Sequence, residues 1–279
     1  MRVFNVSHSL VKHLSNQNRP LGFVPTMGAL HDGHLSLINK ALDENRSLLV
    51  SIFINPTQFD DQTDLENYPA NFETDLKKIE QFEGNISVYL PRAFDVYGQK
   101  IQSKSFDLGG LDLVMEGEKR SGHFQGVATV VSYFLNTFQP EKAYFGEKDF
   151  QQLRIVNHIT QSQKLKTEIV SCPIVREKDG LAMSSRNALL TETERKLAPK
   201  LYESLCYAKK NAKHIQYRQL KDSINDFFKK YDLLTLDYFR VTDPVTLKEI
   251  DLEKPVSKGR AFIAAHLGKI RLIDNMDMS

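Results

Sequence analysis

Residues 21–34 read Leu21-Gly22-Phe23-Val24-Pro25-Thr26-Met27-Gly28-Ala29-Leu30-His31-Asp32-Gly33-His34. The start of this stretch is nearly all apolar, as in a short buried strand, and apolar residues at helical spacing follow at Leu35, Leu37, Ile38, Ala41 and Leu42. The stretch therefore predicts a strand, a turn that contains glycine, and the first turn of a helix. In a doubly wound sheet, a helix that begins there offers its N-terminal N–H groups to a phosphate.

Strand and helix signals continue to alternate over the first two-thirds of the chain. The run at 48–54 is apolar at nearly every position, which is typical of a parallel strand covered on both faces. Further strands are expected at 86–90, 142–145 and 168–175, and helices at 72–82, 127–138 and 150–159. This alternation predicts an α/β fold with a Rossmann-like, doubly wound parallel sheet.

The pattern changes after about residue 175. Two charged amphipathic helices are expected near 191–213 and 217–231, followed by strands at 235–242 and 260–273. We therefore expect two domains, a Rossmann-like domain over 1–175 and a smaller α+β domain over 176–279.

The composition excludes several classes of protein. The chain has 279 residues with a formal net charge of +2, so any site for a polyanion must be local, and a broad surface for nucleic acid or an anionic membrane is not expected. Cys172 and Cys206 are expected to be free thiols, because two cysteines provide neither a disulfide framework nor a Cys-rich zinc site. The N-terminal sequence lacks the apolar core of a secretion signal, and no apolar run approaches ~18 residues, so we expect a soluble cytoplasmic protein.

His31 and His34 are candidates for phosphate binding. If the helix begins near Asp32, both rings lie by its first turn and can donate to the same anion. Two histidines in an arbitrary loop are more often solvated surface residues. Strand, glycines, histidines and helix in one segment favour an anion site.

Two later segments place cations beside turns. Gly146-Glu147-Lys148-Asp149 follows the strand at 142–145, where Lys148 suits a phosphate and Asp149 a ribose hydroxyl. Met183-Ser184-Ser185-Arg186-Asn187 combines hydroxyls with a guanidinium, which suits a lid over a triphosphate. The alternative interpretations are a solvated helix start and a capped helix start.

Uncharged side chains also follow the expected strands. Gln58 and Gln152 carry amides that suit a small polar substrate, although a lone glutamine is more often merely solvated. Arg120-Ser121-Gly122-His123 precedes the helix at 127–138 and fits an anion site and a simple turn equally well.

Together these segments resemble the pantothenate synthetases, also called pantoate-β-alanine ligases, a family of nucleotidyltransferases with a His-x-Gly-His signature. The resemblance extends over nearly the whole chain, and its ordered motifs are far more specific than His-x-Gly-His alone. They lie at residues 23–37, 51–59, 122–130, 144–153, 175–177, 183–187 and 271–275.

The resemblance implies an AMP-forming ligase. Pantoate and ATP give pantoyl-adenylate and pyrophosphate, and β-alanine then displaces AMP to give pantothenate, a precursor of coenzyme A. It also implies that Mg²⁺ accompanies ATP and that the protein forms a homodimer. The implied partners are small molecules, and neither nucleic acid nor a membrane is expected to bind.

The resemblance also assigns residues by their position in the motifs. Those matched to ATP binding are Met27, Gly28, Ala29, Leu30, His31, Asp32, Gly33, His34, Gly146, Glu147, Lys148, Asp149, Val175, Met183, Ser184, Ser185 and Arg186. His34 is the one to which the family assigns catalysis, and His31, Lys148 and Arg186 are donors suited to charge on the phosphates. Gln58 and Gln152 match the glutamines that hold pantoate, and the domain after residue 175 matches a lid.

One segment departs from the family pattern, because Ser121 stands where the family usually has proline. The change frees φ at residue 121, so Arg120 is carried over only weakly. No carboxylate cluster identifies ligands for Mg²⁺, although Asp75 is a candidate, and no residue is identified as the base for the β-alanine step.

Two other functions stay open. A cytidylyl- or adenylyltransferase shares the His-x-Gly-His site but releases a nucleotide conjugate; the uncharged glutamines and the second domain count against it. A binding module for small molecules or RNA keeps the fold without turnover, and the net charge of +2 weakens its RNA version.

Overall fold

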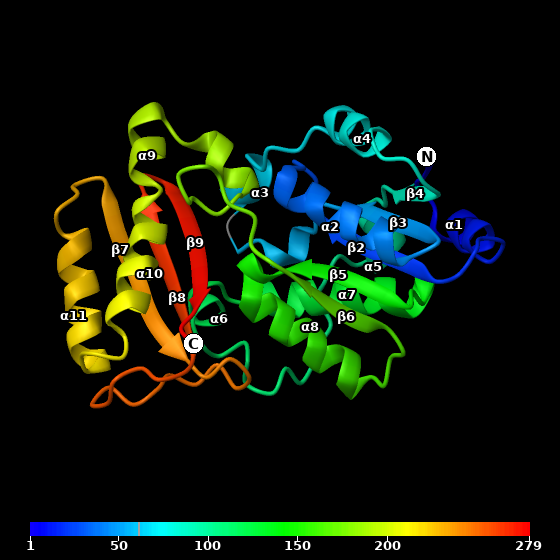
Figure 1. Ribbon diagram of the computed structural model, residues 1–279. Coiled ribbons are helices and arrows are strands. Elements are labelled where there is room, and N and C mark those ends of the chain that lie inside the picture. Colours follow the sequence, from blue (N-terminus) through cyan, green and yellow to red (C-terminus); the bar gives the residue numbers. More distant parts are fainter. Residues whose placement is uncertain (61) are drawn as a thin grey trace. The chain divides into compact units, whose positions relative to one another are not determined.

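The computed structural model describes residues 1–60 and 62–279, and the chain forms two compact units (Figure 1). The first unit comprises Met1–Glu147 and Gln151–Pro173, and the second comprises Lys148–Phe150 and Ile174–Ser279. The second unit thus includes a short segment from the middle of the chain, which a boundary placed after residue 175 does not anticipate.

The first unit is built on a six-stranded parallel sheet. Its strands are β1 (Arg2–Phe4), β2 (Leu21–Thr26), β3 (Ser47–Ile52), β4 (Ile86–Tyr89), β5 (Lys142–Gly146) and β6 (Glu168–Cys172), in the order β1-β4-β3-β2-β5-β6. From β2 onward the chain winds first toward β4 and then, from β5, in the opposite direction. The expected doubly wound α/β sheet is confirmed, and its order reverses between β2 and β5.

Helices cover both faces of this sheet. Val24 of β2 belongs to a buried apolar cluster with residues of α2 (Asp32–Glu44). The preceding residue, Phe23, packs edge to face on Phe134 of α7 (His123–Phe138), with ring centroids 5.7 Å apart. Because successive strand residues point to opposite faces, α2 and α7 lie on opposite sides of β2.

The other helical segments up to residue 162 range from three-residue 3-10 turns to the 13-residue α8 (Phe150–Ser162), which buries Ile155, Val156 and Ile159. Besides α8 they are α1 (Ser7–Leu14), η1 (Pro56–Gln58), α3 (Gln62–Glu66), α4 (Phe72–Glu80), α5 (Ala93–Tyr97), α6 (Glu116–Lys119) and η2 (Glu147–Asp149). The sequence interpretation missed β1 and α1, because a three-residue exposed edge strand has no visible periodicity and α1 lacks a side-chain N-cap.

The second unit is a small α+β structure, as expected. Its antiparallel sheet has the order β7-β8-β9, formed by β7 (Leu234–Thr242), β8 (Arg260–Leu267) and β9 (Ile270–Asp277). The helical segments are η3 (Ser185–Leu189), α9 (Glu192–Leu197), α10 (Lys200–Asn211) and α11 (Tyr217–Phe228). Leu205 of α10, Ile224 of α11 and Ile263 of β8 share one buried core.

Two expected elements of this unit were wrong in their extent. The strand expected over 260–273 is a hairpin, because Gly268, with φ of 56°, turns the chain between β8 and β9. The helix expected over 191–213 is interrupted before α10 by Pro199, which has no N–H to continue a helix. In both cases one Gly or Pro interrupts a continuous apolar pattern.

Both cysteines are free thiols, as expected, with Cys172 buried and Cys206 exposed. Burial raises the pKa of the Cys172 thiol to about 11, so this side chain stays protonated near neutral pH. Of the helices described here, none combines the length and apolar character needed to cross a bilayer. The described residues also contain no cluster of three or more His, Cys, Asp or Glu suited to a metal ion.

Candidate active site

The turn between β2 and α2 has a backbone that side chains hold in place. Gly28 and Ala29 have φ of 87° and 50°. The Asp75 carboxylate of α4 accepts the N–H groups of Ala29 at 2.9 Å and Leu30 at 2.7 Å. A Cβ atom at residue 28 would lie 2.9 Å from Asp75 Oδ2, so both the positive φ and this close approach require glycine.

Asp75 serves this turn in the structure, whereas the sequence suggested it as a Mg²⁺ ligand. Its side chain is 1% exposed, and each carboxylate oxygen accepts one backbone N–H. A buried carboxylate is costly without such partners. These two contacts account for its burial, and its observed role is to hold the turn.

His31 and His34 lie against each other at the start of α2. His31 is the N-cap residue, and its Nδ1 accepts the N–H of Gly33 at 3.1 Å. The Nδ1 of His34 accepts the N–H of His31 at 3.4 Å, and the ring centroids are 4.1 Å apart. Because Nδ1 is the acceptor in both rings, the proton of each neutral ring is on Nε2. The pair therefore presents two Nε2–H donors at a helix N-terminus.

This helix N-terminus lies at the position where doubly wound sheets bind ligands. β2 and β5 are paired neighbours, and the chain order reverses between them. Ligands of such folds bind outside the carboxyl ends of the strands at this reversal. The turn at 27–31 leaves β2 there, and Gly146 ends β5 at the same edge of the sheet.

Gln58 ends η1 and contacts the turn after β2. Its Nε2 donates to Met27 Sδ at 2.6 Å, and its Oε1 accepts from Asn55 Nδ2 at 3.1 Å. A thioether is a weak acceptor, so the amide can exchange this contact for a substrate oxygen at little cost. The structure thus brings together Met27 and Gln58, two residues that the sequence assigns to different substrates.

Asn55 is a buried polar residue beside Gln58 that the sequence interpretation did not single out. Its Oδ1 accepts from the Tyr97 hydroxyl and the Thr57 N–H, and its Nδ2 donates to the carbonyl of Gly126. Burial raises the pKa of Tyr97 to about 12, so this hydroxyl stays a donor. An Asn-Pro pair after a buried strand was the available signal, but Tyr97 and Gly126 are 42 and 71 residues away in sequence.

Arg120 and His123 hold the main chain of Gln58. His123 Nδ1 donates to the Gln58 carbonyl at 2.7 Å, and Arg120 Nη2 donates to the same oxygen at 3.3 Å. Arg120 Nη1 lies 3.3 Å from His123 Nε2, which makes Nε2 the acceptor and places the ring proton on Nδ1. Arg120 and His123 therefore support η1, a role that the sequence interpretation, which weighed an anion site and a simple turn equally, did not include.

Gln151 and Gln152 are adjacent but have different surroundings. Gln151 is buried, and its Nε2 donates to the carbonyls of Leu111 and Val114, each at 2.7 Å. Gln152 is half-buried, and its side chain has no hydrogen-bond partner within the described residues. Gln151 thus braces the loop before α6, while the Gln152 amide has its hydrogen-bonding capacity available for a ligand.

The other predicted nucleotide contacts after β5 divide between the two units. Glu147, in the first unit, accepts from the Ser171 hydroxyl at 2.7 Å. Lys148 and Asp149 are in the second unit, and Lys148 Nζ lies 3.4 Å from Asp149 Oδ1. The Lys148 side chain is 19% exposed.

Val175 and residues 183–186 form one hairpin-like loop in the second unit. The N–H of Met183 donates to the Val175 carbonyl at 3.0 Å. Ser184 is the N-cap of η3, and its Oγ accepts the N–H of Arg186 at 3.3 Å. The structure therefore brings Val175 beside the predicted Met183–Arg186 set.

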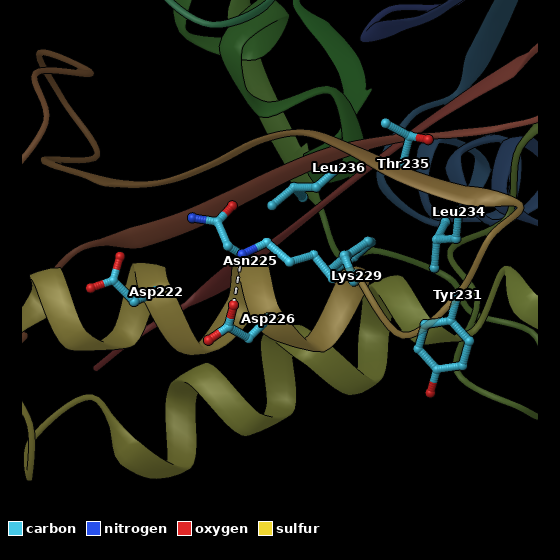
Figure 2. Close-up of a pocket in the computed structure, with 9 residues that line it drawn as sticks. Asp222, Asn225, Asp226, Lys229, Tyr231, Leu234, Thr235 and Leu236 are labelled. Atoms are coloured by element: carbon cyan, nitrogen blue, oxygen red, sulfur yellow. Dashed lines mark hydrogen bonds and ion pairs between the residues drawn. The ribbon is translucent and has the colours of Figure 1, made fainter.

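A groove in the second unit is separate from these residues (Figure 2). It lies between α11 and β7, where Asp226 and Lys229 form an ion pair at 2.9 Å near Leu234 and Leu236. None of the predicted site residues is among the described residues that line it. We therefore do not include it in the candidate site.

Comparison with known proteins identifies the family. The family model described as pantoate-beta-alanine ligase matches residues 2–277. The chain belongs to the pantoate-beta-alanine ligase family. A pantothenate synthetase of Christiangramia forsetii is 44% identical over 282 residues and is covered over 100% of both chains. A relative of the same name from Bacteroides fragilis is 39% identical, over 99% of this chain and 98% of its own length.

Solved structures agree with this assignment. The pantothenate synthetase of Thermus thermophilus aligns with a TM-score of 0.92 and 34% identity, over 100% of this chain and 99% of that chain. The pantoate-beta-alanine ligase of Francisella tularensis, solved with beta-gamma ATP and beta-alanine, aligns with a TM-score of 0.82 and 32% identity, over 100% and 98%. The chain is therefore an enzyme of a ligase family, and the expected fold is confirmed.

Proposed function

We propose that this chain condenses pantoate with β-alanine in an ATP-dependent reaction through a pantoyl-adenylate. The observation that carries the proposal is the pair of imidazoles of His31 and His34 at the N-terminus of α2, whose Nδ1 atoms accept backbone N–H groups. They lie where a doubly wound sheet binds a nucleotide, in a chain of the pantoate-beta-alanine ligase family.

In the first step, a pantoate carboxylate oxygen attacks the α-phosphorus of ATP. The new P–O bond forms as the bond to pyrophosphate breaks, and negative charge grows on the phosphoryl and leaving oxygens. His31, His34, Lys148 and Arg186 donate to these oxygens, so they stabilise the transition state more than the ground state. The attacking carboxylate is already ionised near neutral pH and needs no base.

The residues that the motifs assign to ATP occur in both units. Met27–His34, Gly146 and Glu147 belong to the first unit, and Lys148, Asp149, Val175 and Met183–Arg186 belong to the second. In this proposal the Rossmann-like unit binds ATP and pantoate, and the smaller unit acts as a lid.

Pantoate is held by the amides of Gln58 and Gln152. An amide both donates and accepts, so it can bind the hydroxyl and carboxylate groups of pantoate without placing a charge beside the nucleophile. Two observations support this assignment. The Gln58 amide has only a weak acceptor in Met27 Sδ, and the Gln152 side chain has no hydrogen-bond partner among the described residues.

In the second step, the β-alanine amine attacks the acyl carbon and AMP leaves. The amine must be neutral to attack, and no side chain is assigned as its base. Exclusion of water protects the mixed anhydride until the amine arrives.

Mg²⁺ accompanies ATP in this proposal. The described residues contain no cluster of three or more acidic or metal-binding side chains, and Asp75 is engaged by backbone N–H groups. These surroundings fit an ion whose ligands are mainly phosphate oxygens and water molecules, as is common for Mg²⁺. When bound, the ion neutralises phosphate charge.

We also propose that the protein is a cytoplasmic homodimer and that its partners are small molecules and not nucleic acid.

ATP–pyrophosphate exchange with and without pantoate tests the proposal, followed by AMP release on addition of β-alanine. We expect exchange only with pantoate, and AMP release only when β-alanine is also present. Pantoate-independent exchange would indicate a nucleotidyltransferase, and nucleotide binding without exchange would indicate a binding module.

A further inference from the structure

Asp274 and Asn275 are buried polar residues of β9 with no role in the mechanism above. They end the motif at 271–275 that contributes to the family resemblance, and they are 4% and 1% exposed. Buried polar side chains are costly unless hydrogen-bonded. Their partners therefore indicate what they do.

Asp274 holds the loop that leads to Arg186. Its carboxylate accepts two hydrogen bonds from Arg176, at 2.6 and 3.0 Å. Arg176 follows Val175, forms a main-chain bridge with Ala182 and donates to the Gly180 carbonyl. This ion pair, in which Asp274 is buried and Arg176 half-buried, thus fixes the hairpin-like loop whose second arm leads into Met183–Arg186.

Asn275 holds the segment that carries Lys148. Its Nδ2 donates to the Lys148 carbonyl at 2.9 Å, and its Oδ1 accepts from Arg260 Nη1 at 2.6 Å. Because Arg260 has only donors, it fixes the amide with Nδ2 toward Lys148. The Arg260 guanidinium also lies 4.0 Å from the ring centre of Phe150, so both Lys148 and Phe150 are tied to the sheet.

The two contacts lie on opposite faces of one strand. Successive strand residues point to opposite sides, and the register pairs Asp274 with Ile263 and Asn275 with Phe262. Ile263 is in the buried core of the second unit. Phe262 lies on the other face and contacts Phe150, with ring centroids 5.9 Å apart. Adjacent residues thereby reach two segments that are remote in sequence.

We propose that Asp274 and Asn275 are positioning residues that fix the Arg186 loop and the Lys148 segment to opposite faces of β9. The segments that carry Lys148 and Arg186 are then both held in place by the same strand of the second unit. The consequence for catalysis rests on the proposed function, because it requires Lys148 and Arg186 to contact the triphosphate. The structural part of the inference does not depend on any activity.

Hydrogen–deuterium exchange of two variants tests the structural part. Asn275→Ala is expected to raise hydrogen–deuterium exchange in peptides over 146–152 and to leave peptides over 174–187 near wild type. Asp274→Asn is expected to raise it over 174–187 and to leave 146–152 near wild type. The change should be about tenfold, the factor for a lost hydrogen bond of about 1.4 kcal/mol. Equal increases in both segments in each variant, or none in either, would overturn the inference.

A matched control is available in the same sheet. Asp237 pairs with Arg271 at 2.9 Å, and their side chains are 12% and 20% exposed, close to the 2% and 19% of Asp274 and Arg176. Asp237→Asn is expected to change exchange in neither segment. If Asp274→Asn leaves Arg176 unpaired and does not fold, the double variant Arg176→Met with Asp274→Leu replaces the pair by apolar groups and tests the same contact.

Kinetics test the catalytic consequence. Asn275→Ala should raise the ATP KM or lower the rate of ATP–pyrophosphate exchange about tenfold, with the pantoate KM within about twofold of wild type. Parallel changes in both KM values, or none, would overturn the positioning role. If the wild-type protein has no pantoate-dependent ATP–pyrophosphate exchange, the proposed function fails. Hydrogen–deuterium exchange in the two segments still tests the structural inference in that case.

Discussion

At the scale of single residues, His31 and His34 have different structural roles in the turn that begins α2. His31 caps α2 by accepting the Gly33 N–H at 3.1 Å through Nδ1, whereas the Nδ1 of His34 accepts the His31 N–H at the longer distance of 3.4 Å. His34→Ala should therefore lower adenylate formation about 10²–10³-fold with little loss of stability. His31→Ala should in addition cost about 1 kcal/mol, the value of an N-cap.

The assigned tautomer makes this prediction sharper. His34→Gln retains an N–H donor near the position of Nε2, whereas His34→Asn does not reach it. We expect ATP–pyrophosphate exchange in the order wild type, Gln, Asn, and thermal unfolding close to wild type in both. Near-wild-type turnover in His34→Ala or His34→Asn would remove His34 from its proposed role.

Gln58 is predicted to depend on His123 for its position. His123→Ala removes a donor to the Gln58 carbonyl without touching its amide, so the pantoate KM should rise several-fold, more than the ATP KM. His158→Ala is the control, because His158 Nε2 bonds the Asp107 carbonyl in the same unit at 3.1 Å. Gln58→Ala and Gln152→Ala should change the pantoate KM in the same direction. Equal effects on both substrates would contradict the pantoate assignment.

At the scale of elements, the turn from β2 to α2 depends on how closely it packs against α4. Gly28→Ala and Gly110→Ala both place alanine at a positive φ, 87° and 75°. The new Cβ meets Asp75 Oδ2 at 2.9 Å at residue 28, but nothing within 4 Å at residue 110. Gly110→Ala should cost about 1–2 kcal/mol from backbone strain, and Gly28→Ala more.

Chemical denaturation and ATP–pyrophosphate exchange together check this comparison. Gly28→Ala should also lower exchange, because it displaces the carboxylate that holds the turn before His31. Gly110→Ala should leave exchange unchanged. Equal losses of stability in the two variants would mean that backbone strain alone accounts for the requirement for glycine at residue 28.

At the scale of the whole molecule, Glu44 at the end of α2 makes stability depend on pH. Lys40, Lys142 of β5 and the Tyr144 hydroxyl lie 2.9 Å from its carboxylate. Hydrogen bonds from Lys40, then Lys142 and Tyr144, lower the pKa of Glu44 from 4.5 to about 2. A carboxyl with a depressed folded pKa stabilises the protein above the unfolded pKa, and this contribution is lost as the pH falls through the folded value.

Glu44→Gln should therefore lower stability near neutral pH and reduce the loss of stability between about pH 4.5 and pH 2. Glu80→Gln, at an exposed position of α4, is the control and should follow the wild-type profile. Denaturant unfolding across this pH range measures both. An unchanged slope in Glu44→Gln would show that these contacts do not stabilise the fold.

The sequence by itself determined the strand-helix alternation and which residues are candidates for the site, because apolar periodicity, glycine turns and motif spacing are local properties of the chain. The tertiary structure decided which residues support those candidates. Asp75, His123 and Asn275 reach the backbones of residues 29, 58 and 148 across 46, 65 and 127 positions of sequence. Such contacts depend on the order of strands in each sheet and on which face a side chain occupies, and no local pattern records either.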